Sequence, residues 1–234
     1  MTARAIDPTE HHGAAGSTIR DLVLGVADGL TVPFALAAGV TGAVAASGIV
    51  LTAGLAEIAA GAISMGLGGY LAARSEAQHY RTEYAREMRE THEMPNEELA
   101  EVMTILQGYG VREPVLSRVV HEIASDREQW VEFMMRNELG LEKPDERAAP
   151  RSAALVGGGY ILGGIFPLAP YAFFANAHDA LLWSIGCTSI ALLAFGVIRA
   201  KVLETPVVVG ALQSWFIGAV AAAVAYGLAR LVAH

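Results

Sequence analysis

Five long apolar segments constrain this chain more than any other feature of its sequence. They lie at about residues 19–46, 49–73, 153–174, 180–200 and 206–231. A helix needs about 20 mostly apolar residues to cross the hydrocarbon core of a bilayer, and each segment meets that length. Inside a membrane the backbone polar groups must be satisfied within the protein, as they are in a helix. The sequence therefore predicts an all-α membrane protein with five transmembrane helices.

The charged residues are concentrated in one polar insert between the second and third apolar segments. They make up 17% of the chain, and most of them lie between Arg74 and Arg151. The first residues are polar and mixed in charge, so no cleavable signal peptide is expected. We expect four parts: a disordered N-terminal tail at 1–17, transmembrane helices one and two at 18–74, a helical insert at 75–150, and transmembrane helices three to five at 151–234.

The insert is expected to contain three helices. The stretch 74–93 has no glycine or proline and should continue the second apolar helix beyond the membrane. Proline favours the first turn of a helix, and glycine favours its end. These residues predict the other two helices at 95–108 and 114–139.

The lysines and arginines predict which side of the membrane each loop faces. Basic residues gather on the cytoplasmic side of membrane proteins. With the N-terminus in the cytoplasm, 15 of the 16 lysines and arginines fall on that side, and only Arg230 falls outside. The two outer turns, at 47–48 and 176–179, carry none. We therefore expect a cytoplasmic insert and a C-terminus on the far side.

Composition and motifs exclude several classes of protein. The formal net charge of −8 disfavours nucleic acid as a partner. No phosphate-binding loop, GxGxxG, HExxH or kinase motif occurs in the sequence, so no nucleotide is expected and any pumping would draw on ion gradients. The single cysteine, Cys187, excludes an intramolecular disulfide and disfavours a thiolate metal site.

Two acidic residues lie deep inside the predicted membrane helices. Asp28 is about 13 Å along the first, near the middle of the bilayer, and Glu57 is at similar depth in the second. A carboxylate there costs roughly 2.5–3.5 kcal/mol, and no lysine or arginine lies at matching depth. Glu57, Gly61 and Met65 share one helix face, and two carboxylates with a thioether suit a borderline divalent ion. The alternative is that the acids are protonated and only hydrogen-bond helices together.

The insert repeats acidic residues at helical spacing. They lie on its first two helices, and the third adds two methionines and one more glutamate. Such oxygen and thioether ligands suit Fe²⁺, Mn²⁺ and Zn²⁺. The alternative is an ordinary solvated surface. The candidate metal-binding residues are Glu87, Glu90, Glu98, Glu101, Met134, Met135 and Glu138.

Three segments resemble the vacuolar iron transporter family, and the likeness covers about residues 18–232. They are the segments 28–36 (DGLTVPFAL), 54–66 (GLAEIAAGAISMG) and 133–144 (FMMRNELGLEKP). The resemblance implies a homodimer with five spans per subunit that exchanges cytosolic Fe²⁺ for protons. It implies a pathway along the dimer interface lined by Asp28, Glu57 and Met65, and it gives the insert's glutamates and methionines the role of collecting metal.

The resulting hypothesis is a secondary transporter, not an enzyme, that moves Fe²⁺ out of the cytoplasm in exchange for protons, for iron detoxification and homeostasis. No prosthetic group is expected, only the transported divalent metal. One alternative is an exporter of the same architecture that prefers Mn²⁺. Another is a membrane-anchored metal sensor or store without flux. The compact length favours a prokaryote, in which the location would be the inner membrane.

Overall fold

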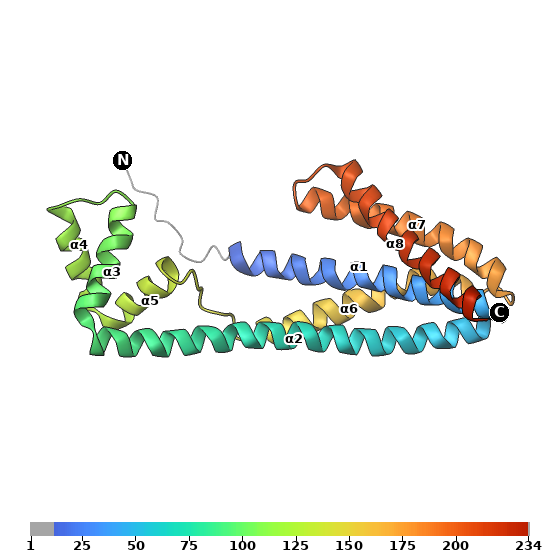
Figure 1. Ribbon diagram of the computed structural model, residues 1–234, viewed down its shortest axis with the longest axis horizontal. Coiled ribbons are helices and arrows are strands. Elements are labelled where there is room, and N and C mark those ends of the chain that lie inside the picture. The colour runs from blue at the N-terminus through green and yellow to red at the C-terminus, as the bar shows by residue number, and fades with distance from the viewer. Residues whose placement is uncertain (1–11, 234) are drawn as a thin grey trace. The chain divides into compact units, whose positions relative to one another are not determined.

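The computed structural model of the chain describes residues 12–233, and its regular structure is helical. Five helices are long and apolar enough to cross a membrane, as predicted (Figure 1). They are α1 (His12–Ala43), α2 (Ser47–Glu93), α6 (Ala148–Leu168), α7 (Ala177–Val202) and α8 (Val207–Val232). A short 3₁₀ helix, η1 (Ala169–Ala172), follows α6. The chain divides into two compact units, residues 1–71 with 149–234 and residues 72–148.

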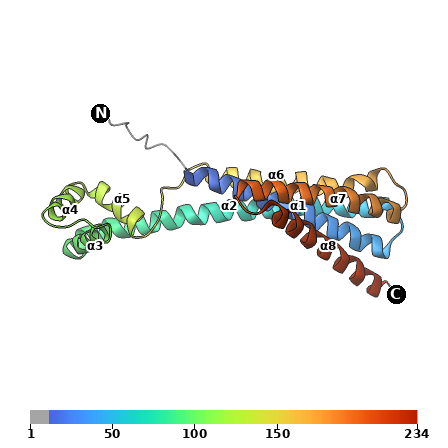
Figure 2. The same cartoon turned by 90° about the horizontal axis from the view of Figure 1, so that it is seen from above.

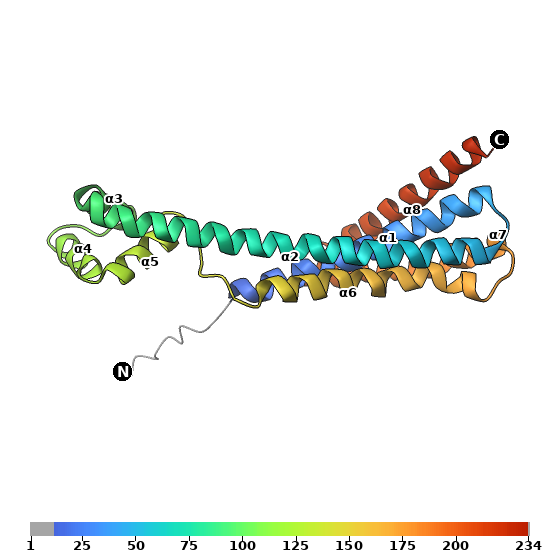
Figure 3. The same ribbon diagram turned by 90° about the horizontal axis from the view of Figure 1, so that it is seen from below.

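In the first unit, α6 packs against both α1 and the first half of α2 (Figure 3). One face of α6 contacts α2, and another face contacts α1. A side chain at Gly157 would lie 2.9 Å from the carbonyl oxygen of Ala62 in α2, and one at Gly159 would lie 3.1 Å from the backbone nitrogen of Val26 in α1. Glycine permits such close backbone contact, which is how helices associate in lipid. The glycine-rich start of α6 therefore holds it between the two helices that carry Asp28 and Glu57.

The last helix, α8, packs against α1 and α7 (Figure 2). Phe34, Ala38 and Ala222 form a small buried cluster between α1 and α8. At one end of the unit, the connection from α1 to α2 pairs with the one before α7. There the backbone N–H of Ser47 donates to the carbonyl of Ala175 at 3.1 Å, and that of Ala177 donates to Ala45 at 2.9 Å.

The second unit contains the end of α2 and three short helices that gather around it (Figure 1). These are α3 (Pro95–Gly108), α4 (Val115–Ser125) and α5 (Arg127–Asn137). Their apolar core is contributed by all three helices. It consists of Val102, Leu106, Leu116, Val120, Trp130 and Met134.

Three sequence expectations about helix bounds need correction. The single helix predicted at 114–139 is two helices, because the Asp126 side chain accepts hydrogen bonds from the N–H groups of Glu128 and Gln129 and starts a new helix. The predicted disordered tail at 1–17 is too long, since α1 begins at His12, and residues 1–11 lie outside the described residues. The turn expected at 47–48 lies at 44–46.

Candidate metal sites

Asp28 and Glu57 lie on either side of one tyrosine, Tyr160. Asp28 is half-buried on α1, Glu57 is half-buried on α2, and Tyr160 is buried on α6. The Tyr160 backbone meets α1 at Gly29, next to Asp28, where a side chain would lie 2.3 Å from the Tyr160 carbonyl oxygen. Its ring meets α2 at Gly61, one turn from Glu57. Tertiary packing thus brings Asp28 and Glu57 to a common neighbour.

Glu57 is held by a hydrogen bond from that neighbour. The Tyr160 hydroxyl donates to Oε1 of Glu57. The other carboxylate oxygen, Oε2, is buried and has no hydrogen-bond partner among the described residues. A buried oxygen without a partner is costly, and a cation ligand or a proton would satisfy it. Oε2 of Glu57 is therefore the atom at which a further ligand would bind.

Met65 lies on the same helix as Glu57 but at a different depth. Eight residues along an α-helix correspond to about 12 Å. The two side chains of one subunit therefore do not share one ion. Met65 is half-buried, and the adjacent Gly66 packs against the backbone of Ala153 in α6. The stripe predicted from the sequence is thus a series of positions along α2 and not a single coordination sphere.

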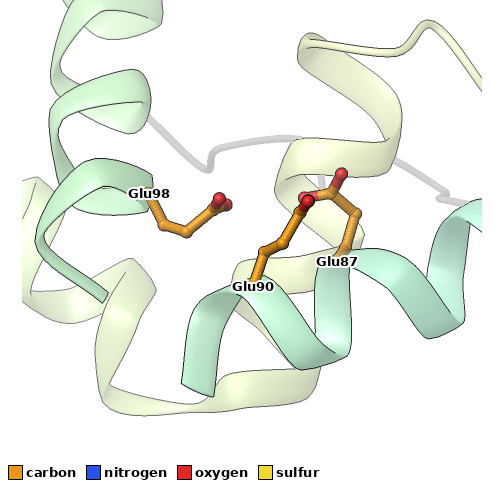
Figure 4. Close-up of side chains that lie close together, drawn as sticks. All are labelled: Glu87, Glu90 and Glu98. Atoms are coloured by element: carbon orange, nitrogen blue, oxygen red, sulfur yellow. The ribbon is translucent and has the colours of Figure 1, made fainter. Parts of the chain in front are cut away.

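Three glutamates of the second unit converge within metal-binding distance. Glu87 and Glu90 project from α2, and Glu98 projects from α3 toward them (Figure 4). One carboxylate oxygen of each lies within 4.8 Å of the others. The three come together because Pro95 starts α3 soon after α2 ends, so that the chain folds back on itself. Among the described residues, these three glutamates are the side chains that lie close enough together to hold a metal ion.

Burial and mutual repulsion change the chemistry of this cluster. Glu87 is 2% exposed and Glu98 is 4% exposed. Burial, followed by repulsion from Glu138 and Glu90, raises the pKa of Glu87 to about 7. Burial, followed by repulsion from Glu87 and Glu101, raises the pKa of Glu98 to about 7. Oε2 of each lacks a hydrogen-bond partner within the described residues. Near neutral pH the cluster is therefore poised between binding protons and binding a cation.

Arg86 supplies positive charge at the edge of the cluster. Its guanidinium contacts Glu90 and Glu83 at 3.2 Å. This contact offsets part of the repulsion felt by Glu87. Arg86 is exposed and on the same helix as Glu90, whose charge it offsets.

The other two predicted glutamates lie at the surface near the cluster of Glu87, Glu90 and Glu98. Glu101 is exposed on α3, and Glu138 is exposed just after α5. Partial shielding from water, followed by repulsion from Glu101, raises the pKa of Glu138. Both residues also act electrostatically on Glu87 and Glu98. Five carboxylates from three chain segments therefore share one electrostatic field.

The two predicted methionine ligands lie on α5 and are fully buried. Met134 is 0% exposed and packs in the apolar core with Trp130, and Met135 is 1% exposed. The backbone N–H of Glu138 donates to the Met134 carbonyl at 2.9 Å, which places Met134 one turn before this glutamate. Burial in the core accounts for Met134 as a packing residue.

Comparison with known proteins identifies the family. The model of the VIT family matches residues 19–230. This chain belongs to the VIT family. "Vacuolar iron transporter 1" of Oryza sativa subsp. japonica is 50% identical over 223 residues, which cover 95% of this chain and 88% of the relative. "Vacuolar iron transporter 1" of Arabidopsis thaliana is 50% identical over 97% of this chain and 90% of the relative. "Protein CCC1" of Saccharomyces cerevisiae is 38% identical over 78% of this chain and 57% of the relative.

The comparisons confirm the resemblance stated from the sequence and support a multi-pass membrane protein of the VIT family. They leave the predicted roles of single residues to be tested. The residue that sequence reasoning missed is Tyr160. The sequence offers one signal for it, because a tyrosine within a glycine-rich membrane helix needs a partner for its hydroxyl. That partner becomes identifiable only when α2 and α6 are placed side by side.

Proposed function

We propose that this VIT family protein transports Fe²⁺ out of the cytoplasm in exchange for protons. The observation that carries this proposal is its 50% identity, over nearly its whole length, to proteins named vacuolar iron transporters. The glutamate cluster of the second unit and the two acids of the membrane helices are consistent with a divalent cation as cargo.

In this proposal the pathway through the membrane runs past Asp28, Glu57 and Met65. The spacing along α2 supports successive binding positions, with the ion passing from one to the next. Carboxylate oxygens suit Fe²⁺, and a thioether adds a softer ligand. Since a carboxylate binds either a proton or a metal, protonation from the acidic side would release the ion, and the exchange would be driven by the proton gradient.

The second unit would collect the ion before it enters the pathway. Its five glutamates concentrate negative charge on the cytoplasmic side, which raises the local concentration of divalent cations. Met134 and Met135 would add thioether ligands next to this cluster, and the metals that fit this set of ligands are Fe²⁺, Mn²⁺ and Zn²⁺. The collecting residues are Glu87, Glu90, Glu98, Glu101, Met134, Met135 and Glu138.

A homodimer would complete the pathway. By the family resemblance, the two copies would share one pathway lined by two sets of Asp28, Glu57 and Met65. The concentration of lysine and arginine in the insert supports its cytoplasmic location. In a prokaryote the protein would lie in the inner membrane, with its C-terminus outside.

Flux into proteoliposomes tests this function directly. The purified protein is reconstituted, and Fe²⁺ uptake is followed with and without an imposed pH gradient. Uptake that requires the protein and increases when the metal-receiving side is acidic supports exchange. Protein-dependent uptake that ignores the gradient would refute the proton coupling but not the transport.

Two rival functions differ from the proposed one: the first in the preferred metal ion, and the second in the absence of transport. Carboxylates and thioethers bind Mn²⁺ as well as Fe²⁺, so a Mn²⁺-preferring exporter predicts that Mn²⁺ outcompetes Fe²⁺ for uptake. A membrane-anchored sensor or store predicts metal binding by the second unit with no flux of either ion. The same proteoliposome assay, with the two metals in competition, separates these outcomes.

A further inference from the structure

Tyr160 is the one residue of α6 that hydrogen-bonds an acidic side chain of the proposed pathway within the described part of the chain. It is 3% exposed, and its hydroxyl donates to Oε1 of Glu57 on the neighbouring helix. A tyrosine hydroxyl is a neutral donor that keeps the proton it donates over the physiological pH range. It can therefore hold a carboxylate in place and leave its charge intact. An arginine or lysine would neutralise that charge.

The glycines around Tyr160 let it pack closely against the helices that carry Glu57 and Asp28. A side chain on Gly61 would lie 2.5 Å from Cε1 of the ring and 2.6 Å from its Cζ and hydroxyl oxygen. The absence of a side chain there makes the space that the ring occupies. On the opposite side, the Tyr160 backbone lies against Gly29 of α1. Tyr160 is thus packed against α1 through its backbone and against α2 through its ring and hydroxyl.

One oxygen of Glu57 is held by this arrangement, and the other remains available. Oε2 is buried and has no hydrogen-bond partner within the described residues. Groups that hydrogen-bond a metal ligand orient it, and their loss typically lowers metal affinity 10–100-fold. We infer that Tyr160 is a positioning residue for transport, which holds Glu57 by Oε1 so that Oε2 is presented to the divalent cation. This inference rests on the proposed function, since it assigns a role in metal passage.

Replacing the hydroxyl alone tests this role. Tyr160→Phe keeps the ring against Gly61 and removes the donor to Glu57. In proteoliposomes loaded with equal amounts of folded protein, the KM for Fe²⁺ should rise about 10-fold or more. The maximal flux should change much less, because the rest of the pathway is intact. A purely structural role would instead lower the amount of folded protein and the maximal flux, with KM unchanged.

Tyr171→Phe is the matched control. Tyr171 is also a buried tyrosine of the first unit, 2% exposed, and its hydroxyl hydrogen-bonds Oγ1 of Thr41 at 3.0 Å. Its partner is a threonine, so the loss of this bond should lower thermal stability and leave the KM for Fe²⁺ at the wild-type value. An equal rise of KM in both variants would overturn the proposal, because it would show a general effect of losing a buried hydroxyl.

A second variant, on α2, disturbs the same hydrogen bond between Tyr160 and Glu57. Gly61→Ala places a methyl group where the Tyr160 ring lies and should displace the hydroxyl, so it should also raise KM. Gly68→Ala is its control, since a side chain there meets nothing within 4 Å. If wild-type flux is clear and neither Tyr160→Phe nor Gly61→Ala changes KM, the inference fails and the proposed function stands. If the wild-type protein itself shows no flux, the proposed function fails first.

Discussion

The two units handle buried carboxylates in different ways. In the first unit each membrane acid is isolated, and Glu57 is met by a neutral hydroxyl between tightly packed helices. In the second, Glu87 and Glu98 lie among other glutamates that raise the pKa of both to about 7. An isolated carboxylate in lipid must be satisfied by its nearest neighbours. A carboxylate among like charges is satisfied by a proton or a cation, which favours capture.

Removing the isolated acid should have the largest effect. We expect Glu57→Gln to reduce Fe²⁺ flux by at least about 10-fold, because the pathway loses a charged ligand that no neighbouring acid replaces. Flux into proteoliposomes at saturating Fe²⁺ measures this. Asp179→Asn, at an exposed position in the first turn of α7, is the control and should transport normally. Normal flux by Glu57→Gln would remove this residue from the pathway.

Removing two acids from the cluster should have a smaller effect on flux and a larger one on binding. In Glu87→Gln with Glu98→Gln, Fe²⁺ binding by the full-length protein should weaken by at least about 10-fold. At saturating Fe²⁺ the flux should fall only a few-fold, because the membrane ligands are intact. Calorimetry and flux on the same preparation check both values. Glu97→Gln, an exposed glutamate in the first turn of α3, should bind as the wild type does.

The cluster should also bind metal in a pH-dependent manner. Below pH 7, Glu87 and Glu98 retain protons that a metal must displace. Affinity for Fe²⁺ should therefore rise between pH 6 and pH 8 in wild type, by about 10-fold for each of the two groups that binds the metal, and much less in the double glutamine variant. Titration calorimetry at several pH values, with proton release read from buffers of different ionisation enthalpy, measures this. A flat profile in wild type would contradict the argument from burial and repulsion.

The same two groups set the sign of the stability change with pH. Their folded-state pKa lies above the unfolded value, so the folded state binds protons more tightly. Without metal, their contribution to stability is fully present below about pH 4.5 and is lost as the pH rises through about 7. Melting temperatures of the metal-free protein should fall over this range, and added Fe²⁺ should restore stability at pH 8. A rise without metal would contradict the pKa direction.

The smallest effect concerns the helix break that separates α4 from α5. Asp126→Ala removes the side-chain oxygen that caps α5 and should destabilise the second unit by about 1 kcal/mol. Asp126→Asn keeps an oxygen acceptor and should be close to wild type. Chemical denaturation of both variants measures the difference. Because Asp126 is not among the cluster glutamates, Fe²⁺ binding by the folded protein should stay unchanged in both.

The local signals of the sequence were sufficient for most helix bounds. Pro95 and Gly108 delimit α3 as expected, because proline and glycine act on the backbone of their own neighbourhood. The break at Asp126 was missed, although Ser125-Asp126 with Glu128 is a typical start of a helix. Pro114 and Gly140 predict one helix between them, and the local capping by Asp126 divides it into two.

By itself, the sequence determined that the chain has five membrane helices, that Asp28 and Glu57 lie deep within two of them and that the insert is acidic. Apolar length, charge and helical spacing are properties of consecutive residues, so they can be read without a structure. Only the tertiary structure decided that Glu87, Glu90 and Glu98 meet across two helices and that Tyr160 holds Glu57. Those contacts join residues from separate helices, and glycine-permitted close approach and the return of the chain at Pro95 bring them together.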